Sequence, residues 1–320
     1  METPFSVQVG VGRTSVASGA LCPACESTSV SGYVDVPDHE YALSYVARYA
    51  SCGTCRTVYQ HPMPRESELG GFYPATYHSM TNGGWLMDRR RAMRIERLKK
   101  LLGPPPCLVL DYGCGNGSFL VAAARQLTEH RYVGFEYSET PERQELEGGK
   151  VVIIRGQLPH LLAALASLGE VAVLIMNHVV EHLPDPSHVM RSLTPHMAAH
   201  AVFDGQTPNA DSLEHRLFGS RWSGYHAPRH TVVFSKSGLR SFMERHGFGD
   251  ITIRGAFNPA GVAVSLGTLP QRAEGLIVRK GLSWFALVAV ASALMPVDLL
   301  SGLPGMVDFA GRLKPGANGS

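Results

Sequence analysis

Four of the six cysteines have the spacing of metal ligands. Cys22 and Cys25 form one CxxC pair, and Cys52 and Cys55 form a second pair after a spacer of residues 26–51. Four thiolates in this pattern are typical of a closed tetrahedral Zn²⁺ site that leaves no position open for a substrate. We therefore expect a structural Zn²⁺. A redox dithiol is the alternative, although it would more naturally use a single CxxC beside a βαβ unit.

A glycine-rich turn, within residues 108–119, predicts a cofactor pocket. An apolar strand ends in Asp111, and Gly113, Gly115 and Gly117 then lead into a helix. Glycines allow a ligand to approach the backbone closely. The GxGxG spacing differs from the GxGxxG that receives a dinucleotide pyrophosphate, and an acid is a poor neighbour for phosphate. The turn instead suits a ligand with an α-amino group, such as S-adenosylmethionine (SAM).

A second acid strengthens this interpretation. Glu136 ends the next strand, within YVGFEYSE, where a carboxylate can accept hydrogen bonds from both ribose hydroxyls. A glycine turn alone would be weak evidence for a SAM site. Here the turn and the two acids, Asp111 and Glu136, all lie at strand ends, and together they make the interpretation stronger. An ordinary α/β turn with an accidental acid is the alternative.

Strands and helices must alternate to position these residues. Short apolar runs at 107–111, 131–136, 151–155, 171–177 and 200–205 are separated by helical stretches such as SFLVAAARQL and PSHVMRSL. This alternation predicts an α/β fold with a Rossmann-like parallel sheet. After the helix KSGLRSFMERHG, the runs ITIRGAF and VAVSLG are interpreted as a closing hairpin.

Composition changes along the chain divide it into five segments. Residues 1–20 are expected to be a flexible leader, and 21–62 a zinc-binding module with too few apolar residues for a core of its own. An aromatic segment and a basic helix occupy 63–104. The catalytic domain is expected at 105–270, followed by an apolar helical extension at 271–320.

Several motifs together resemble class I SAM-dependent methyltransferases. DYGCGNGSF is similar to their motif I, and NHVVEHLPDP to the segment after their fourth strand. TPNADSLEHRLFG, APRHTVVFS and LRSFMERHGF resemble one branch that carries an N-terminal CxxC…CxxC module. That branch includes C-methyltransferases acting on nucleotide-linked deoxysugars. The resemblance covers roughly residues 20–255 and does not identify the acceptor.

The resemblance implies a set of residues around the cofactor. Those expected to contact or flank SAM are Tyr77, Asp111, Gly113, Gly115, Glu136, Gln157, Asn177 and His178. Tyr77 and Tyr73 belong to FYPATYHS, a segment that closes over the SAM and acceptor sites in relatives; simple packing is the alternative. Relatives often carry an acid where this chain has Gln157, whose amide can still hydrogen-bond the adenine edge.

Two histidines are candidates for the chemistry. Methyl transfer is an in-line displacement that needs a base when the nucleophile starts as a hydroxyl or a carbon acid. His230, in APRHTVVFS, matches the base of the sugar C-methyltransferases, and His182 follows Glu181 after the fourth strand. An acid often precedes that histidine in relatives, whereas here Arg229 does, which favours an anionic acceptor held by Arg229. Structural roles are the alternatives for both histidines.

One metal motif is discounted. His178-Val-Val-Glu181-His182 fits the HxxEH pattern of some zinc peptidases. In those enzymes the pattern lies on a helix, but here it follows a strand directly and runs into Leu-Pro-Asp-Pro. A peptidase is therefore not expected.

Charge and hydropathy limit the classes of partner that are expected. The net charge of +2 and a lack of interleaved aromatic residues argue against nucleic acid. The arginine-rich stretch 89–100 is interpreted as a solvated helix face, with a diphosphate-bearing acceptor or an anionic membrane surface as alternatives. Residues 284–295 are almost wholly apolar yet too short to span a bilayer. A buried helix is expected there, with peripheral membrane contact as the alternative.

These patterns predict a SAM-dependent methyltransferase that acts on a small-molecule or carrier-linked biosynthetic acceptor, a sugar among the candidates. A cytoplasmic location is expected, because residues 1–20 lack the features of a secretion signal. A membrane-associated enzyme with a lipid-linked acceptor, and a non-catalytic SAM-binding scaffold, are the alternatives.

Overall fold

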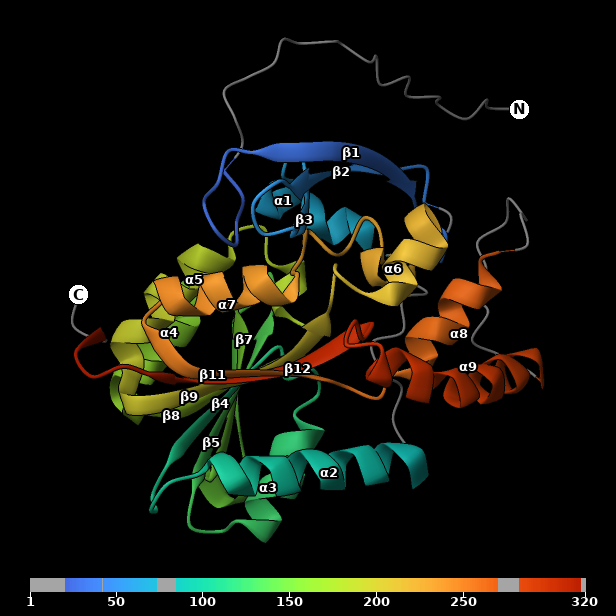
Figure 1. The fold of residues 1–320 in the computed structure, drawn as a ribbon. Coiled ribbons are helices and arrows are strands. Elements are labelled where there is room, and N and C mark those ends of the chain that lie inside the picture. Colours follow the sequence, from blue (N-terminus) through green and yellow to red (C-terminus); the bar gives the residue numbers. More distant parts are fainter. Residues whose placement is uncertain (1–20, 42, 74–84, 270–281, 318–320) are drawn as a thin grey trace, which may run out of the picture.

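A computed structural model describes residues 21–41, 43–73, 85–269 and 282–317. Figure 1 shows a large central sheet with a smaller sheet above it. The large sheet contains β4 (Leu108–Tyr112), β5 (Arg131–Tyr137), β6 (Glu142–Leu146), β7 (Val151–Gly156), β8 (Val171–Asn177), β9 (Met197–Pro208), β11 (Phe248–Gly255) and β12 (Met306–Leu313). The smaller sheet contains β1 (Val30–Pro37), β2 (Val46–Cys52), β3 (Val58–Gln60) and β10 (Val232–Val233).

The large sheet confirms the predicted Rossmann-like architecture. Its strand order is β11-β12-β9-β8-β4-β5-β7-β6. β4, β5, β7, β8 and β9 pair in parallel, whereas β6 and β12 pair antiparallel to their neighbours. All residues of β4 are buried, as expected for a strand covered on both faces. Each predicted apolar run forms one of the parallel strands. The charged edge strand β6 was not predicted.

Helices cover both faces of this sheet. The α-helices of the described residues are α1 (Glu66–Leu69), α2 (Trp85–Leu101), α3 (Ser118–Gln126), α4 (Leu158–Leu168), α5 (Pro186–Leu193), α6 (Leu213–Phe218), α7 (Lys236–Arg245), α8 (Pro259–Gly267) and α9 (Leu282–Leu300). In Figure 1, α2 and α3 lie on one face, and α4, α5 and α7 lie on the face that also carries the smaller sheet.

The smaller sheet joins the cysteine-bearing segment to the catalytic part of the chain. Its strand order is β1-β2-β3-β10, and β10 comes from the segment that carries His230. Val232 pairs with Tyr59, and Val233 pairs with Val58. Residues 21–62, here called the N-terminal module, therefore do not fold apart from the rest.

The C-terminal part differs from the sequence expectation in two ways. The predicted hairpin partner VAVSLG is helical and belongs to α8, because its apolar side chains pack against α9. The antiparallel partner of β11 is instead β12. Residues 271–320 were expected to be a helical extension, yet β12 lies inside the large sheet between β9 and β11. Alternating burial along Met306–Leu313 is consistent with a strand.

α9 presents an apolar face to solvent. One side packs on α8 through Ala291 and Met295, which fits the buried-helix expectation in part. The other side exposes Phe285 (70%) and Leu300 (87%), together with Val290, Leu294 and Val297. None of the helices in the described residues is long and apolar enough to cross a membrane.

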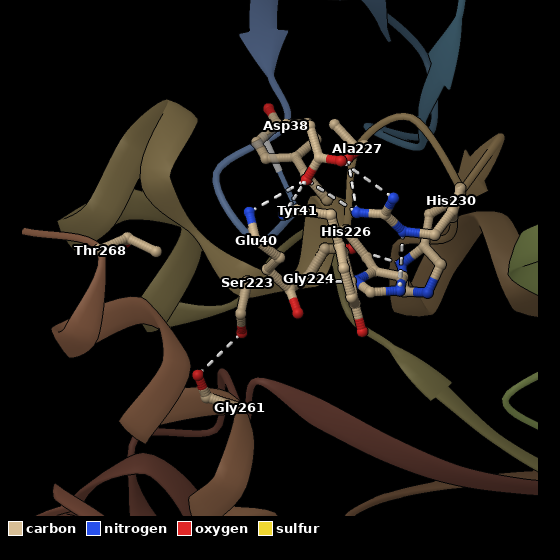
Figure 2. A network of polar contacts seen from close by, with 12 residues as sticks. Asp38, Glu40, Tyr41, Ser223, Gly224, His226, Ala227, His230, Gly261 and Thr268 are labelled. Carbon is tan, nitrogen blue, oxygen red and sulfur yellow. Dashed lines mark hydrogen bonds and ion pairs between the residues drawn. The ribbon is translucent and has the colours of Figure 1, made fainter. Parts of the chain in front are cut away.

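A buried ion pair connects the N-terminal module to the loop that carries His230. Arg229 and Asp38 have fully buried side chains, and both carboxylate oxygens accept from the guanidinium at 2.8 and 3.0 Å. Further acceptors are the carbonyls of Phe72 and Ala227 and Nε2 of His226. Figure 2 shows Asp38 beside this loop. All five guanidinium N–H groups therefore have partners.

Asp38→Ala is expected to lower the free energy of unfolding by about 3–5 kcal/mol, because it leaves the Arg229 charge buried without its partner. Urea unfolding followed by circular dichroism measures this loss. Asp35→Ala is the matched control in the same module, since the Asp35–Arg48 pair is largely exposed and should change stability by less than about 1 kcal/mol. Equal losses in both variants would contradict the importance of burial.

Candidate active site

The candidate site lies where the parallel strands of the large sheet end. Asp111 and Glu136 lie near the ends of β4 and β5, Gln157 follows β7, and Asn177 ends β8. Since β4 pairs with β5 and β8, and β5 pairs with β7, these residues come together at one edge. Ligands of open α/β sheets bind at this edge. His178 follows directly, with an exposed side chain and a φ of +56°.

The glycine turn is held against the end of β5. The N–H groups of Gly113 and Cys114 both donate to the Phe135 carbonyl, at 2.7 and 2.9 Å. Gly113 has a φ of +79°, and a Cβ at this position would lie 2.4 Å from Cγ2 of Val179. Glycine is required here on both counts. The loop after β8 therefore packs directly against the glycine turn.

Two largely buried carboxylates, Asp111 and Glu136, lie at this edge. Burial, opposed by the Arg94 guanidinium 3.5 Å away, raises the pKa of Asp111 to about 6. Burial also raises the pKa of Glu136. The Gly115 N–H, which donates to Glu136 Oε2 at 2.6 Å, acts in the opposite direction and lowers this pKa. Both carboxylates lose hydration on folding, so a ligand ammonium or a hydroxyl donor would be stabilised here.

Two arginines of α2, Arg94 and Arg97, are only partly exposed and are paired with acids, which corrects in part the expected solvated helix face. Arg97 binds Asp204 through Nη2 at 2.6 Å and Nε at 2.9 Å, and its Nη1 lies 2.7 Å from Asp308. Arg94 lies over the ring of Phe119, at 4.0 Å from its centroid. These contacts dock α2 on the sheet, because Asp204 and Asp308 belong to β9 and β12.

His182 and His230 lie together beside the strand ends. Their ring centroids are 4.5 Å apart and nearly perpendicular. His182 Nδ1 is 3.1 Å from the Arg229 carbonyl and 3.0 Å from the Tyr73 hydroxyl. Burial lowers the pKa of His182 to about 4, and burial with the neighbouring His182 and His226 lowers the pKa of His230 well below its usual range. Both imidazoles are therefore neutral at physiological pH.

Arg229 does not face an acceptor, so the expectation that it holds an anion is wrong. Each of its donors is already used, and the Tyr41 ring lies 4.6 Å from its guanidinium carbon. His226 accepts from Arg229 through Nε2, so its Nδ1 carries the proton that it shares with Glu40 at 2.5 Å. Figure 2 shows Glu40 and His226 in this contact.

Sequence reasoning missed Asp38, Glu40 and His226. The two acids belong to the N-terminal module, far from the histidines in sequence, and no local motif marks them. The sequence offers a single indication of them. Relatives often carry an acid directly before the histidine that matches His230, whereas this chain has Arg229 there, and a buried arginine would need an acidic partner. Tyr77 lies outside the described residues, as does the expected leader at 1–20. Tyr73 is half-exposed and contacts His182.

The four module cysteines also come together. Their sulfur atoms lie within 4.8 Å of one another, with Cys22–Cys55 and Cys25–Cys52 each at 3.6 Å. These distances are too long for disulfides. They are close to the separation of about 3.8 Å expected between ligands of a tetrahedral Zn²⁺ with Zn–S bonds of about 2.3 Å. The cysteine set therefore fits a zinc ion.

Comparison with known proteins identifies a family but no acceptor. Residues 86–253, more than half of the chain, match the family described as "Methyltransferase domain". No curated protein matches the sequence significantly.

Several solved structures resemble the fold. A SAM dependent methyltransferase from Archaeoglobus fulgidus is 17% identical with a TM-score of 0.40, and the match covers 71% of this chain and 98% of that one. An O-methyltransferase family protein from Burkholderia thailandensis is 12% identical with a TM-score of 0.43, covering 72% and 58%. Phosphoethanolamine N-methyltransferase 2 from Haemonchus contortus is 12% identical with a TM-score of 0.45, covering 73% and 54%. This chain therefore spans little more than half of the latter two proteins.

The family match includes the glycine turn, both acidic strand ends and the loop with His182. It coincides with the region in which the parallel strands meet at one edge. The chain therefore belongs to the methyltransferase-domain family, and it is a SAM-dependent methyltransferase.

Proposed function

We propose that this enzyme transfers the methyl group of SAM to an oxygen of a small-molecule acceptor, with His182 and His230 on the acceptor side. The supporting observation is that each imidazole has Nδ1 within hydrogen-bond distance of a backbone carbonyl, at 3.1 and 2.8 Å. A carbonyl only accepts, so Nδ1 of His230 carries the proton and its Nε2 keeps its lone pair. We assign His182 the same tautomer, in which the Tyr73 hydroxyl also accepts from Nδ1. In the transfer, the acceptor oxygen bonds to the methyl carbon, and the electron pair of the broken C–S bond stays on sulfur. The hydroxyl proton passes to an imidazole.

An oxygen nucleophile fits these histidines better than a carbon nucleophile. Burial lowers the pKa of both imidazoles, which makes them weak bases. A hydroxyl loses its proton as the new bond forms, whereas a carbanion must be generated first and needs a stronger base. A sugar hydroxyl is one acceptor of this kind. The acid that precedes the base histidine in sugar C-methyltransferases is replaced here by the fully paired Arg229.

The donor side is assigned to the strand ends. We place the SAM ammonium at Asp111 and its carboxylate at Arg94, because these oppositely charged groups are 3.5 Å apart. The ribose hydroxyls are assigned to Glu136. Three further residues are kept beside the cofactor: Gln157, Asn177 and His178. Tyr77 is retained as a residue that closes over SAM on the basis of the resemblance alone.

Asp111→Asn is expected to weaken SAM binding by about tenfold or more, since it removes a charge-assisted hydrogen bond to the ammonium. In the wild type, the carboxylate becomes protonated below its pKa of about 6, so the Kd for SAM should rise as pH falls through that value. The variant should lack most of this pH dependence. Isothermal titration calorimetry with SAM at several pH values measures both effects. Glu170→Gln is the control, because Glu170 is exposed and precedes β8, at the end of that strand opposite the site. An unchanged Kd in Asp111→Asn would overturn the assignment.

We assign the cysteine cluster a structural Zn²⁺. The carbonyl of Cys55 accepts hydrogen bonds from the hydroxyls of Ser235 and Ser237 at the start of α7. Tyr49 and Gln60, on the two strands that flank Cys52 and Cys55, donate to the His230 carbonyl. Organising the cysteine turns would therefore also organise the loop that carries His230.

Replacing Cys22 and Cys25 by Ser is expected to reduce zinc from one ion per chain to near zero and to destabilise the whole protein, because metal binding supplies folding free energy to this segment. Plasma mass spectrometry and thermal unfolding measure the two effects. Cys107→Ser is the control, since Cys107 lies outside the cluster and its thiol contacts the Pro104 carbonyl. A zinc content of one per chain in the double variant would exclude the assignment.

A lipid-linked acceptor is the second candidate, and the exposed face of α9 favours it. That face carries Phe285, Val290 and Leu294 without a charged neighbour among its exposed residues. An interfacial helix presents such a face to the acyl region of a membrane. Deleting residues 282–320 would also remove β12, so substitutions on the helix surface are the better test.

The acceptor class is tested with methyl-labelled SAM and an extract of the source cells, separated into aqueous and lipid fractions. We expect label in the aqueous fraction, and its loss in His230→Gln. Label in the lipid fraction that disappears in the triple variant Phe285→Gln, Val290→Gln, Leu294→Gln would instead establish the lipid-linked acceptor. Sedimentation of both proteins with liposomes is the independent readout. Label that persists in His230→Gln would contradict the proposed acceptor side.

A further inference from the structure

Glu181, His182 and His230 form a second cluster with the composition of a metal site. Within the described residues, one candidate ligand atom from each lies within 4.8 Å of the others. Glu181 and His182 belong to the 3₁₀ turn η3 (Val180–His182), and His230 lies beside β10. The turn and the loop are joined by the Thr231 N–H, which donates to the Glu181 carbonyl at 2.8 Å.

The two imidazoles are oriented as metal ligands usually are. A ligating histidine commonly donates its second N–H to a backbone carbonyl, which fixes the ring and its tautomer. His182 and His230 both have this arrangement through Nδ1, so their Nε2 atoms are available to an ion. The carboxylate is fixed in the same way, because Thr207 donates its hydroxyl to Glu181 Oε2 at 3.0 Å.

The remaining carboxylate oxygen has no hydrogen bond. Glu181 is fully buried, and its Oε1 has no hydrogen-bond partner. His178 Nδ1 is 3.6 Å from this oxygen, which is beyond hydrogen-bond distance. His178 can therefore interact with this oxygen only electrostatically. A buried carboxylate oxygen without a hydrogen bond costs folding free energy, and a ligand at this position would satisfy it.

We propose that Glu181, His182 and His230 bind one divalent first-row metal ion, such as Mn²⁺, Fe²⁺ or Zn²⁺, and that the ion binds the acceptor through its oxygens. Two histidines and one carboxylate leave coordination positions open for substrate. With ligand bonds of about 2.1 Å, the ligand atoms would lie about 3–3.5 Å apart, so the cluster would tighten around the ion. The expected acceptor is then a small molecule with two neighbouring oxygens that both bind the ion, and one of these oxygens receives the methyl group.

This inference rests on the proposed function in placing the acceptor at the same histidines, but it changes their role. The ion lowers the pKa of the bound hydroxyl as a Lewis acid. The hydroxyl proton is then released to solvent, and the oxygen attacks the methyl carbon as described above. The histidines would hold the ion rather than take the proton, so a metal requirement separates the two mechanisms.

The test uses Mn²⁺ on the full chain with zinc already in the cysteine cluster. Mn²⁺ prefers imidazole and carboxylate ligands to thiolates, so it should report on the second cluster alone. We expect electron paramagnetic resonance titration to show one Mn²⁺ bound per chain. Glu181→Gln, which can still accept from Thr207, and His230→Gln should each weaken binding by about 100-fold or more. His188→Ala, an exposed histidine on α5, is the matched control and should bind as the wild type does.

Methyl transfer supplies the second readout. A chelator that leaves the cysteine-bound zinc in place should abolish transfer, and added Mn²⁺ should restore it in the wild type and not in Glu181→Gln. Absence of Mn²⁺ binding, or equal binding in Glu181→Gln and the wild type, overturns the metal site. Transfer that needs His230 but withstands the chelator would overturn the metal site and retain the proposed imidazole base. Mn²⁺ binding at the cluster with transfer unaffected by His230→Gln would instead refute the proposed acceptor side.

Discussion

The buried pair of Arg229 and Asp38 is the constraint on which the position of His230, and with it the proposed acceptor side, depends. A guanidinium without solvent must have every donor satisfied. Asp38, the carbonyls of Phe72 and Ala227, and His226 provide those acceptors. The loop that carries His230 can therefore adopt this conformation only when the N-terminal module is in place against it.

The four cysteines of the module are connected to the same loop through two strands. Cys22 and Cys25 lie before β1, whereas Cys52 ends β2 and Cys55 lies between β2 and β3. β3 in turn pairs with β10, which follows His230. Tyr49 of β2 and Gln60 of β3 both donate to the His230 carbonyl. The proposed zinc ion would therefore need no contact with substrate to affect catalysis, because it would hold the turns that position these strands.

The positions of the strand-end residues were predictable from sequence, whereas the surroundings of His182 and His230 were not. Asp111, the glycine turn and Glu136 are local features of strand–turn–helix units, and their neighbours follow from parallel pairing. The partners of Arg229 depend on contacts between segments far apart in the chain, for which the sequence has no periodic signal. For the same reason β12 was missed, since its pairing with β9 and β11 arises only after the chain returns from α9.

The strand ends and the histidine pair are held by different parts of the chain. The strand ends belong to the large sheet, whereas the module donates hydrogen bonds to the His230 carbonyl. His182 contacts Tyr73 and the Arg229 carbonyl, and the module holds that loop through Asp38, Tyr49 and Gln60. We therefore expect substitutions in the module to affect His182 and His230 more than the strand ends. The family match covers residues 86–253 and therefore includes both histidines but not the module that holds them.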